Sequence, residues 1–342
     1  MKIVFHPHSL ERNAYVKHIT EALERKGIQV FSLDDILSNK KLFKEISIVH
    51  LNWYENLGSH WGFIKKMSRL FYLLFHKKKI IWTLHNKKPH TAKVLYLQKI
   101  LFKLLCKYAS TIIIHSKQSE KIITAQDKSF QKKIVYTPHP NYIDVYGPLR
   151  PIQSIHGPLS LIFMGVIKPY KNIELLMEVL NNFDANEVTL TIAGRCPDDN
   201  YANQLKLKPS SNNINLEFGY ISDDQIATYI QKHDLSILPY DTRSSLNSGT
   251  AILSFSYGTS VICPKIGTIE DIKNQDCLIT YMYDSQEQHK VALKAAVEKA
   301  MLLKKKNTEI FNEWGGILRN EMIKLQDVGI VADVFSQVYK TH

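Results

Sequence analysis

Residues 159–194 read LSLIFMGVIKPYKNIELLMEVLNNFDANEVTLTIAG. The stretch begins with an apolar run at 159–165 and ends with a second one at 188–194, and both runs have the composition of buried strands. Between them a helical segment begins near Ile173, after a short polar loop. A strand, a helix and a second strand in this order form the unit from which parallel sheets are built. The stretch therefore predicts an α/β fold with a parallel sheet.

The same alternation recurs along the whole chain. Twelve strand-like runs can be found, at 3–5, 29–33, 46–51, 79–85, 111–116, 133–139, 159–165, 188–194, 214–220, 235–240, 259–264 and 277–282. Helical segments separate most of them, and a Pro-rich stretch near 148–158 divides the series in two. We expect two doubly wound, Rossmann-like domains facing a cleft, residues 1–150 and residues 151–342. The stretch 305–339 is helical throughout, and its helices are candidates for packing back on the first domain.

The composition is that of a folded protein in a reducing compartment. The chain has 342 residues, of which 44% are hydrophobic, enough for two buried cores. Its four cysteines have neither CxxC nor zinc-ligand spacing, so disulfides and metal ribbons are not expected. The N-terminus, MKIVFHPHSL, has no apolar region typical of a signal peptide. We expect a cytoplasmic protein without membrane spans, with peripheral binding to the inner face of the cell membrane as an option.

Positive charge is concentrated in the first half of the chain. Residues 1–150 hold 26 Lys and Arg against 10 Asp and Glu, a net charge of +16, whereas residues 151–342 have a net charge of −4. Two stretches, 61–79 and 94–109, interleave Lys and Arg with aromatic or aliphatic residues. Such helices can dock on an anionic membrane surface, although both could instead be core-facing helices with solvated outer faces. Nucleic acid is the rival partner, but no nucleic-acid-binding motif supports it.

One candidate anion site lies in the loop at 165–172. No GxGxxG or GxxxxGK[ST] motif follows any predicted strand, so a dehydrogenase or P-loop site is not indicated. Lys168 and Lys171 instead precede the helix that begins near Ile173, and ligands of open parallel sheets bind beyond the carboxyl ends of the strands. Two ammonium groups beside a helix N-terminus would suit a diphosphate. The alternative is a solvated loop with ordinary surface lysines.

A second candidate lies before the apolar helix expected at 251–257, which Gly258 closes. Small polar residues precede this helix and would let backbone amides approach an anion: Ser244, Ser245, Asn247, Ser248, Gly249 and Thr250. Ser248 could equally be only an N-cap. Because both candidate loops follow strands of one predicted sheet, together they would enclose one diphosphate.

Histidines lie at or near several strand ends of the basic half. The run at 79–85 ends with His85, followed by Asn86 and His90, and a histidine at this edge could act as an acid or base near neutral pH. Most isolated histidines have structural roles. This is the interpretation we give to the others: His6, His8, His50, His115 and His139.

Taken in order, several motifs resemble a known family. They are IVHLNWYENL, IIWTLHNKKPH, IIIHSKQSEKI, VYTPHPNYIDVYG, FMGVIKPYKNIELLMEVL, LTIAGRCPD, FGYISDDQIATYIQKHDLSILPY and SGTAILSFSYGTSVICP. This series resembles glycosyltransferases of the two-domain GT-B fold, near family 4 (glycosyl transferases group 1), over nearly the whole chain. The resemblance implies metal-independent transfer of a hexose, with no cofactor, from a UDP- or GDP-linked sugar to a saccharide or lipid-linked acceptor in surface polysaccharide or glycoconjugate synthesis.

The same resemblance implies roles for individual residues. His85 would be catalytic, close to the reacting sugar. The acceptor would be bound by Asn13, Tyr15, Asn86 and His90. The donor would be bound by Gly165, Lys168, Lys171, Tyr240, Ser245, Asn247, Ser248, Gly249 and Thr250.

The chain departs from the family pattern around the last of these motifs. Family 4 enzymes commonly carry two glutamates where this sequence has Ser245 and Leu253, and an arginine where it has Val166. The glutamates would contact the donor sugar and the nucleotide ribose. Two alternatives therefore stay open: a sugar-nucleotide epimerase of the same fold, which needs no acceptor, and a non-catalytic module that binds polyanions.

Overall fold

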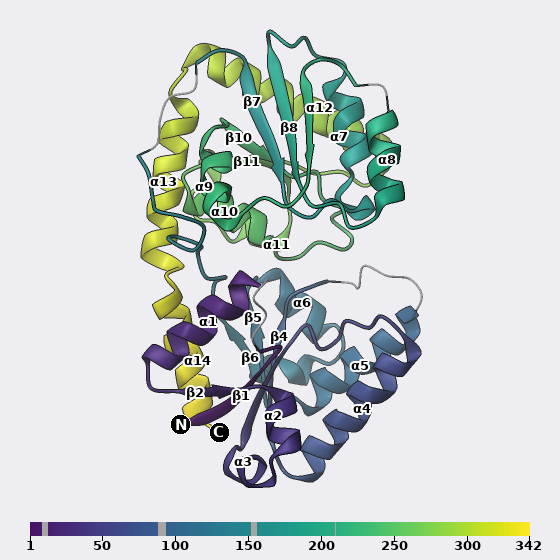
Figure 1. The fold of residues 1–342 in the computed structure, drawn as a ribbon, viewed down its shortest axis with the longest axis vertical. Coiled ribbons are helices and arrows are strands. Elements are labelled where there is room, and N and C mark those ends of the chain that lie inside the picture. The colour runs from purple at the N-terminus through teal and green to yellow at the C-terminus, as the bar shows by residue number, and fades with distance from the viewer. Residues whose placement is uncertain (9–12, 88–93, 152–155, 209) are drawn as a thin grey trace. The chain divides into compact units, whose positions relative to one another are not determined.

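The computed structural model describes residues 1–8, 13–87, 94–151, 156–208 and 210–342. The described chain divides into two compact units. Unit 1 comprises Met1–Pro140, Arg243–Asn247 and Gln326–His342, and unit 2 comprises Asn141–Thr242 and Ser248–Leu325. Each unit contains one six-stranded parallel sheet flanked by helices, as the sequence predicts (Figure 1).

The sheet of unit 1 has the strand order β2-β1-β3-β4-β5-β6. Its strands are β1 (Lys2–His6), β2 (Gln29–Phe31), β3 (Ile48–Asn52), β4 (Lys79–Leu84), β5 (Thr111–Ile114) and β6 (Ile134–Tyr136). Its helices are α1 (Ala14–Arg25), α2 (Leu33–Ser38), α3 (Lys40–Glu45), α4 (His60–Phe75), α5 (Leu95–Tyr108), α6 (Gln118–Thr124), the 3-10 helix η2 (Lys128–Lys133) and α14 (Val328–Lys340). One apolar cluster joins α1 and α14 to one face of this sheet, and another joins α4 and α5 to the other face (Figure 1).

The sheet of unit 2 has the strand order β12-β11-β10-β7-β8-β9. Its strands are β7 (Leu159–Met164), β8 (Val188–Gly194), β9 (Ile214–Phe218), β10 (Leu235–Ile237), β11 (Ser260–Pro264) and β12 (Ile279–Tyr281). Its helices are α7 (Ile173–Leu180), α8 (Asp199–Leu207), α9 (Asp223–Gln231), α10 (Gly249–Ser256), α11 (Gly267–Glu270), α12 (Gln286–Lys306) and α13 (Ile310–Leu325), with 3-10 turns η3 (Pro169–Lys171) and η4 (Gln275–Cys277).

The strand order of unit 2 reverses at β7, which pairs with β8 on one side and with β10 on the other. In doubly wound sheets the crevice beyond the carboxyl ends of strands at such a reversal is the usual ligand site. The loops that follow β7 and β10 contain the two candidate anion-binding segments. The strand order therefore places the two candidate anion-binding segments at the same edge of the sheet in unit 2.

The division between the units falls at 140/141, ten residues before the joint expected from the Pro-rich stretch. The reason is that residues 141–147 are tied to unit 2. The Asn141 side chain donates to the Met322 carbonyl at 3.0 Å, and the Tyr142 N–H donates to Ser256 Oγ at 2.9 Å. The Tyr257 hydroxyl donates to the Gly147 carbonyl at 3.0 Å.

Two segments from the second half of the chain belong to unit 1. Helix α14 packs on α1, and its Tyr339 hydroxyl lies 2.6 Å from His50 Nδ1. Residues 243–247 also group with unit 1, where the fully buried Leu246 joins the cluster under α4 and α5. The chain therefore crosses between the units more often than a two-domain sequence pattern suggests.

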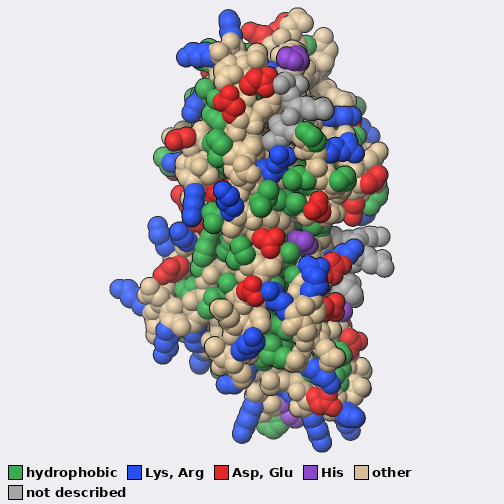
Figure 2. Space-filling view, turned by 90° about the vertical axis from the view of Figure 1, so that its left-hand side faces the viewer, with side chains coloured by type: hydrophobic (Ala, Val, Ile, Leu, Met, Phe, Trp, Pro, Cys, Tyr) green, Lys and Arg blue, Asp and Glu red, His purple; other side chains and the backbone are tan. Residues whose placement is uncertain are grey.

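The excess positive charge of unit 1 lies on α4, α5 and the loop after α4. These segments contain eight Lys and Arg and no Asp or Glu: Lys65, Lys66, Arg69, Lys77, Lys78, Lys99, Lys103 and Lys107. By contrast, the face with α1 and α14 shows basic and acidic side chains interspersed (Figure 2). Across the described ranges, no helix combines the length and hydrophobicity needed to span a bilayer.

Candidate functional site

The loop after β7 places a half-buried ammonium group beside the sheet. Gly165 has φ +135°, a conformation that side chains disfavour, and turns the chain toward η3. Lys171 Nζ lies 5.5 Å from the ring centroids of both Phe163 and Tyr240. Burial, together with the neighbouring charge of Lys168, lowers the pKa of Lys171 to about 8. No carboxylate among the described residues pairs with it, so the charge is available to an anion.

The turn at Gly165 is supported by a second glycine. Gly194, at the end of β8, has φ +137°, and a Cβ at this position would lie 2.1 Å from the Gly165 carbonyl oxygen. The backbones after β7 and β8 therefore touch in a way that only glycine permits at residue 194.

Helix α10 begins next to this lysine. Ser248 is its N-cap: its Oγ accepts from the Ala251 N–H at 3.0 Å, and its own N–H donates to Thr268 Oγ1 at 2.9 Å. The capping role foreseen for Ser248 is thus present. The first N–H groups of a helix have no partner within the helix, and the dipole makes this end attractive to anions.

The two candidate segments converge on Gly165. A Cβ built on Gly165 would lie 3.5 Å from Lys171 Nζ and 3.6 Å from Thr250 Oγ1. Because glycine has no side chain, an ammonium, a hydroxyl and a helix N-terminus face the same point. This arrangement can hold a phosphate or diphosphate by charge and by backbone N–H donation.

The other residues predicted to bind the donor fall into two groups. Tyr240 lies in the cluster, with its hydroxyl 3.1 Å from Ser248 Oγ. Gly249 starts α10. Lys168 is exposed in the loop after β7. Ser245 and Asn247 belong to the segment 243–247, which groups with unit 1.

Sequence reasoning missed Tyr283, which supports this cluster. Its hydroxyl donates to the Tyr240 carbonyl at 2.6 Å and accepts from the Thr242 N–H at 3.1 Å. Its ring stacks on His289, with 3.8 Å between ring centroids. Tyr283 follows the last strand, far from Tyr240 in sequence, so no local pattern indicates the contact.

His85 is buried at the carboxyl end of β4 in unit 1. It is 4% exposed and stacks on Trp53, with 4.0 Å between ring centroids. Its Nε2 lies 3.1 Å from Asn52 Oδ1, and its carbonyl accepts from Asn247 Nδ2 at 3.0 Å. Burial holds the pKa of His85 well below its usual value, with nearby histidines adding to the shift. The residue is therefore neutral at physiological pH.

Tyr15 lies at the centre of a cluster of buried histidines. Its hydroxyl is 2.8 Å from His115 Nε2, and its ring contacts the rings of His85 and His139. His115 Nδ1 lies 3.0 Å from the Thr137 carbonyl, so Nδ1 carries the proton and Nε2 accepts from Tyr15. The pKa of His115 is lowered to about 4 and that of His139 to about 3, in both cases mainly because the side chain is buried.

The remaining residues predicted to bind the acceptor differ in their placement. Asn13 is the N-cap of α1, where its side chain accepts from the Val16 N–H. Asn86 lines a cavity of about 490 Å³ in unit 1. His90 lies outside the described residues.

The same cavity contains a carboxyl group that sequence reasoning missed. Glu55, in the loop after β3, is 6% exposed and lines the cavity. Its Oε2 accepts from Trp82 Nε1 at 3.0 Å, and burial raises the pKa of Glu55 to about 7. A glutamate in a loop normally signals solvent exposure, so the sequence alone does not mark it.

Replacing Glu55 by Gln is expected to stabilise unit 1 at alkaline pH. The pKa of Glu55 in the folded state is higher than the ordinary glutamate value of 4.5. Ionisation of Glu55 therefore lowers the free energy of unfolding as the pH rises above 4.5, and the full loss is reached above pH ~7. The variant should gain about 2–3 kcal/mol at pH 8 and less than about 1 kcal/mol at pH 5. Urea denaturation at both pH values measures this, and an equal gain at both would contradict the assigned burial cost.

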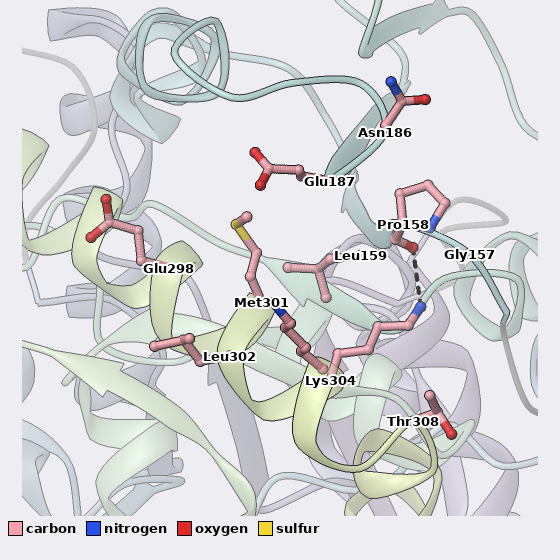
Figure 3. A pocket seen from close by; sticks show the side chains of 11 residues that line it. Gly157, Pro158, Leu159, Asn186, Glu187, Glu298, Met301, Leu302, Lys304 and Thr308 are labelled. Carbon is pink, nitrogen blue, oxygen red and sulfur yellow. Dashed lines mark hydrogen bonds between the residues drawn. The ribbon is translucent and has the colours of Figure 1, made fainter.

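A larger cavity, of about 620 Å³, lies at the opposite edge of the sheet in unit 2. Its residues include Leu159 at the start of β7 and Met301, Leu302 and Lys304 of α12 (Figure 3). Lys304 Nζ donates to the Pro158 carbonyl at 3.0 Å. It also forms an ion pair with Asp234, with 2.6 Å between Nζ and Oδ2. Because this edge carries the amino ends of the strands, the pair joins α12 to the sheet and indicates no ligand site.

Comparison with known proteins agrees with the fold. Residues 149–310 match the family Glycosyl transferases group 1. Over 261 residues the chain is 23% identical to a GDP-mannose:glycolipid 4-beta-D-mannosyltransferase of Xanthomonas campestris pv. campestris, covering 74% of this chain and 70% of that protein.

Solved structures share the architecture at low sequence identity. HepE of Anabaena, in complex with UDP-glucose, matches with a TM-score of 0.69 and 14% identity over 100% of both chains. Sucrose-phosphate synthase from Thermosynechococcus elongatus matches with a TM-score of 0.71 and 14% identity over 100% of this chain and 98% of the other. Residues 149–310 thus match the family Glycosyl transferases group 1, and with its two parallel six-stranded sheets the chain has the GT-B fold.

Proposed function

We propose that the protein transfers a sugar from a nucleoside diphosphate sugar to a saccharide or lipid-linked saccharide. The observation that carries this proposal is the convergence of Lys171 Nζ and Thr250 Oγ1 on Gly165 at the N-terminus of α10. The donor nucleotides named for the relatives support it: GDP-mannose for the Xanthomonas enzyme and UDP-glucose for HepE. The glycolipid in the first of these names favours a lipid-linked acceptor.

In this proposal the chain's own groups neutralise the leaving diphosphate. Negative charge grows on the diphosphate as its bond to the sugar breaks, and preorganised donors stabilise that charge. Lys171 supplies a cation that is already desolvated, and the first N–H groups of α10 add partial positive charge. A bound metal is then not required for the transfer.

Transfer should be observable with a defined acceptor. The protein is incubated with radiolabelled GDP-mannose or UDP-glucose and a synthetic polyprenyl-diphosphate-linked saccharide, with and without EDTA. We expect label to enter the lipid fraction in both conditions. An altered sugar nucleotide formed without acceptor would instead support the epimerase alternative, and steeply salt-dependent binding to nucleic acid without nucleotide affinity would support the polyanion-binding module.

We further propose that unit 1 binds anionic membrane surfaces through α4 and α5. Large apolar side chains on these helices are exposed among the basic residues: Trp61, Ile64, Phe71, Tyr72, Phe75, Leu95 and Tyr96. Apolar insertion and attraction to anionic lipids act together at such surfaces.

Vesicle binding tests this surface. Trp61 and Phe75 are 74% and 82% exposed, and changing both to Ser should weaken binding to phosphatidylserine-containing vesicles by at least about 10-fold, because each ring contributes roughly 1.5–3 kcal/mol on burial. Leu207→Ser is the control, since this residue is 84% exposed on unit 2. Equal loss in the control, or equal binding to neutral vesicles, would argue against the proposal.

A further inference from the structure

We infer that a cavity of about 410 Å³ in unit 1 binds the phosphate headgroup of a membrane lipid, with Lys40 and Lys44 of α3 as the residues that contact the anion. The inference rests on the proposed membrane binding of unit 1 and deepens it, because it names one chemical group of the lipid and assigns it a site. The volume lies within the roughly 300–1,000 Å³ of small-molecule sites.

The cavity lies at the edge of the sheet where β3 and β4 begin. Helix α3 ends at Glu45, shortly before β3, and the lining residues His76 and Lys78 lie between the end of α4 and the start of β4. Substrates of parallel α/β domains bind beyond the other edge, at the carboxyl ends of the strands. A ligand of this cavity therefore has a role other than that of a sugar substrate.

The lining of the cavity carries positive charge that no carboxylate balances. Lys40, Lys44 and Lys78 line it, and no Asp or Glu of the described chain does so. None of the three forms an ion pair with another described residue. The carboxylates of α2 and α3 are engaged elsewhere: Asp34 with Arg69 at 2.5 Å, Asp35 with Ser32 in the capping box of α2, and Glu45 with Lys2 at 2.6 Å. An external anion would supply the missing negative charge.

Two of these lysines repel each other in the absence of a ligand. Lys40 and Lys44 are four residues apart on α3, so their side chains lie on the same side of the helix. Like charges at this spacing destabilise a helix. Both side chains are exposed and can reorient. A phosphate bound between them would replace the repulsion by charge-assisted hydrogen bonds.

A third lysine fixes positive charge beside the cavity. Lys78 is 9% exposed, and its Nζ donates to the carbonyls of Phe43 and Ile46 at the end of α3. The same Nζ lies 4.3 Å from the centroid of the Phe43 ring, which also lines the cavity. These contacts hold the ammonium group in one place. It therefore attracts an anion through space, while Lys40 and Lys44 provide the direct contacts.

Aromatic rings join the cavity to the exposed surface of α4. Tyr72 and His76 line the cavity, and their rings lie 5.3 and 5.1 Å from the ring of Phe43, measured between centroids. Phe75 is 82% exposed and lies 5.3 Å from the His76 ring. A free phosphate would use only the lysines. A lipid would place its phosphate in the cavity and its acyl chains along Phe75, so a lipid accounts for both features.

Three soluble probes test the inference with the full chain: dihexanoyl phosphatidylglycerol, dihexanoyl phosphatidylcholine and inorganic phosphate. Each is titrated by phosphorus NMR, with both lipids below their micelle concentration so that no bilayer is involved. Phosphatidylglycerol should bind at least about 10-fold more tightly than phosphatidylcholine, because the trimethylammonium group of the latter would face Lys40 and Lys44. It should also bind at least about 5-fold more tightly than inorganic phosphate, which has no apolar part to bury.

Substitutions in α3 locate the binding site. Lys40→Ala/Lys44→Ala should weaken phosphatidylglycerol binding by at least about 10-fold, whereas Lys40→Arg/Lys44→Arg should retain most of it, because both charges remain. Lys99→Ala/Lys103→Ala is the matched control. These two lysines of α5 are also exposed and four residues apart, and they do not line the cavity. The control removes the same charge and should change the affinity by less than about 2-fold.

Three results would overturn the inference. They are the absence of phosphatidylglycerol binding, equally tight binding of either other probe, and equal loss of affinity in the two alanine double variants. Vesicle binding of Trp61→Ser/Phe75→Ser and nucleotide binding to unit 2 are followed in parallel. Because neither measurement depends on Lys40 or Lys44, failure of the headgroup site is distinguishable from failure of the proposed function.

Discussion

Replacing Lys171 by alanine is expected to lower the affinity for GDP or UDP by about 100-fold and turnover by at least as much. Lys171 is a half-buried cation with no ionic partner among the described residues, next to the N-terminus of α10. Hydrogen bonds to charged groups contribute about 1.5–3 kcal/mol each, and one ammonium group can bridge two phosphates. Isothermal titration with the nucleotide and initial rates with the sugar nucleotide measure the two losses.

The matched control for this prediction is Lys168→Ala. Lys168 lies three residues away in the same loop but is exposed, so its loss should cost less than about 10-fold. Circular dichroism should show both variants folded. Unchanged affinity in Lys171→Ala, or equal losses in the two variants, would contradict the assigned role of Lys171.

The pKa of Lys171 also predicts how nucleotide affinity depends on pH. With a folded-state pKa of about 8, the side chain loses its positive charge as the pH rises through 8. Affinity for the diphosphate should therefore fall above this pH. A bound anion favours the charged form and raises the pKa, so titrations above pH 8 should show proton uptake on binding.

The second large effect concerns the stability of unit 1 in acid. His50, His85, His115 and His139 are buried, and burial lowers the pKa of each, to about 3 for His50 and about 4 for His115. In the unfolded chain histidine titrates near pH 6.5. Between pH ~6.5 and ~4 the unfolded state therefore binds up to four more protons than the folded state, and stability falls as the pH falls.

The expected loss is roughly 3–4 kcal/mol between pH 7.5 and pH 5.5, after allowing for the opposite effect of Glu55. Urea denaturation followed by tryptophan fluorescence measures it for unit 1, which contains Trp53, Trp61 and Trp82, whereas Trp314 is in unit 2. His50→Gln should lower the proton uptake on unfolding by about one. A free energy of unfolding that is flat over this range would contradict neutral, buried histidines.

Much of the fold could be predicted from the sequence because strands and helices are local patterns. Each of the twelve predicted runs overlaps a strand of the structure. In helix α1, Val16, Ile19 and Leu23 recur at helical spacing and are buried, and Gly27 follows the helix with φ +77°. Loops after strands of one parallel sheet share an edge, and for that reason the order of strands and loops along the chain suffices to predict that Lys171 and Thr250 lie together.

The parts that could not be predicted depend on contacts between distant segments. Glu55 is buried beside Trp82 of β4, whose Nε1 donates to it at 3.0 Å, and the Tyr283 hydroxyl donates to the Tyr240 carbonyl. Leu246 joins unit 1, although it lies in the second half of the chain. None of these has a pattern of neighbouring residues that indicates its partner.

The central claim, that unit 2 binds a diphosphate at the start of α10, is tested most directly by comparing nucleotides that differ only in phosphate number. Isothermal titration with GDP against GMP, and with UDP against UMP, isolates the contribution of the second phosphate. One of the two diphosphates should bind at least 10-fold more tightly than its monophosphate, and Lys171→Ala should abolish the difference. Equal affinity for monophosphate and diphosphate in the wild type, with either base, would contradict the account.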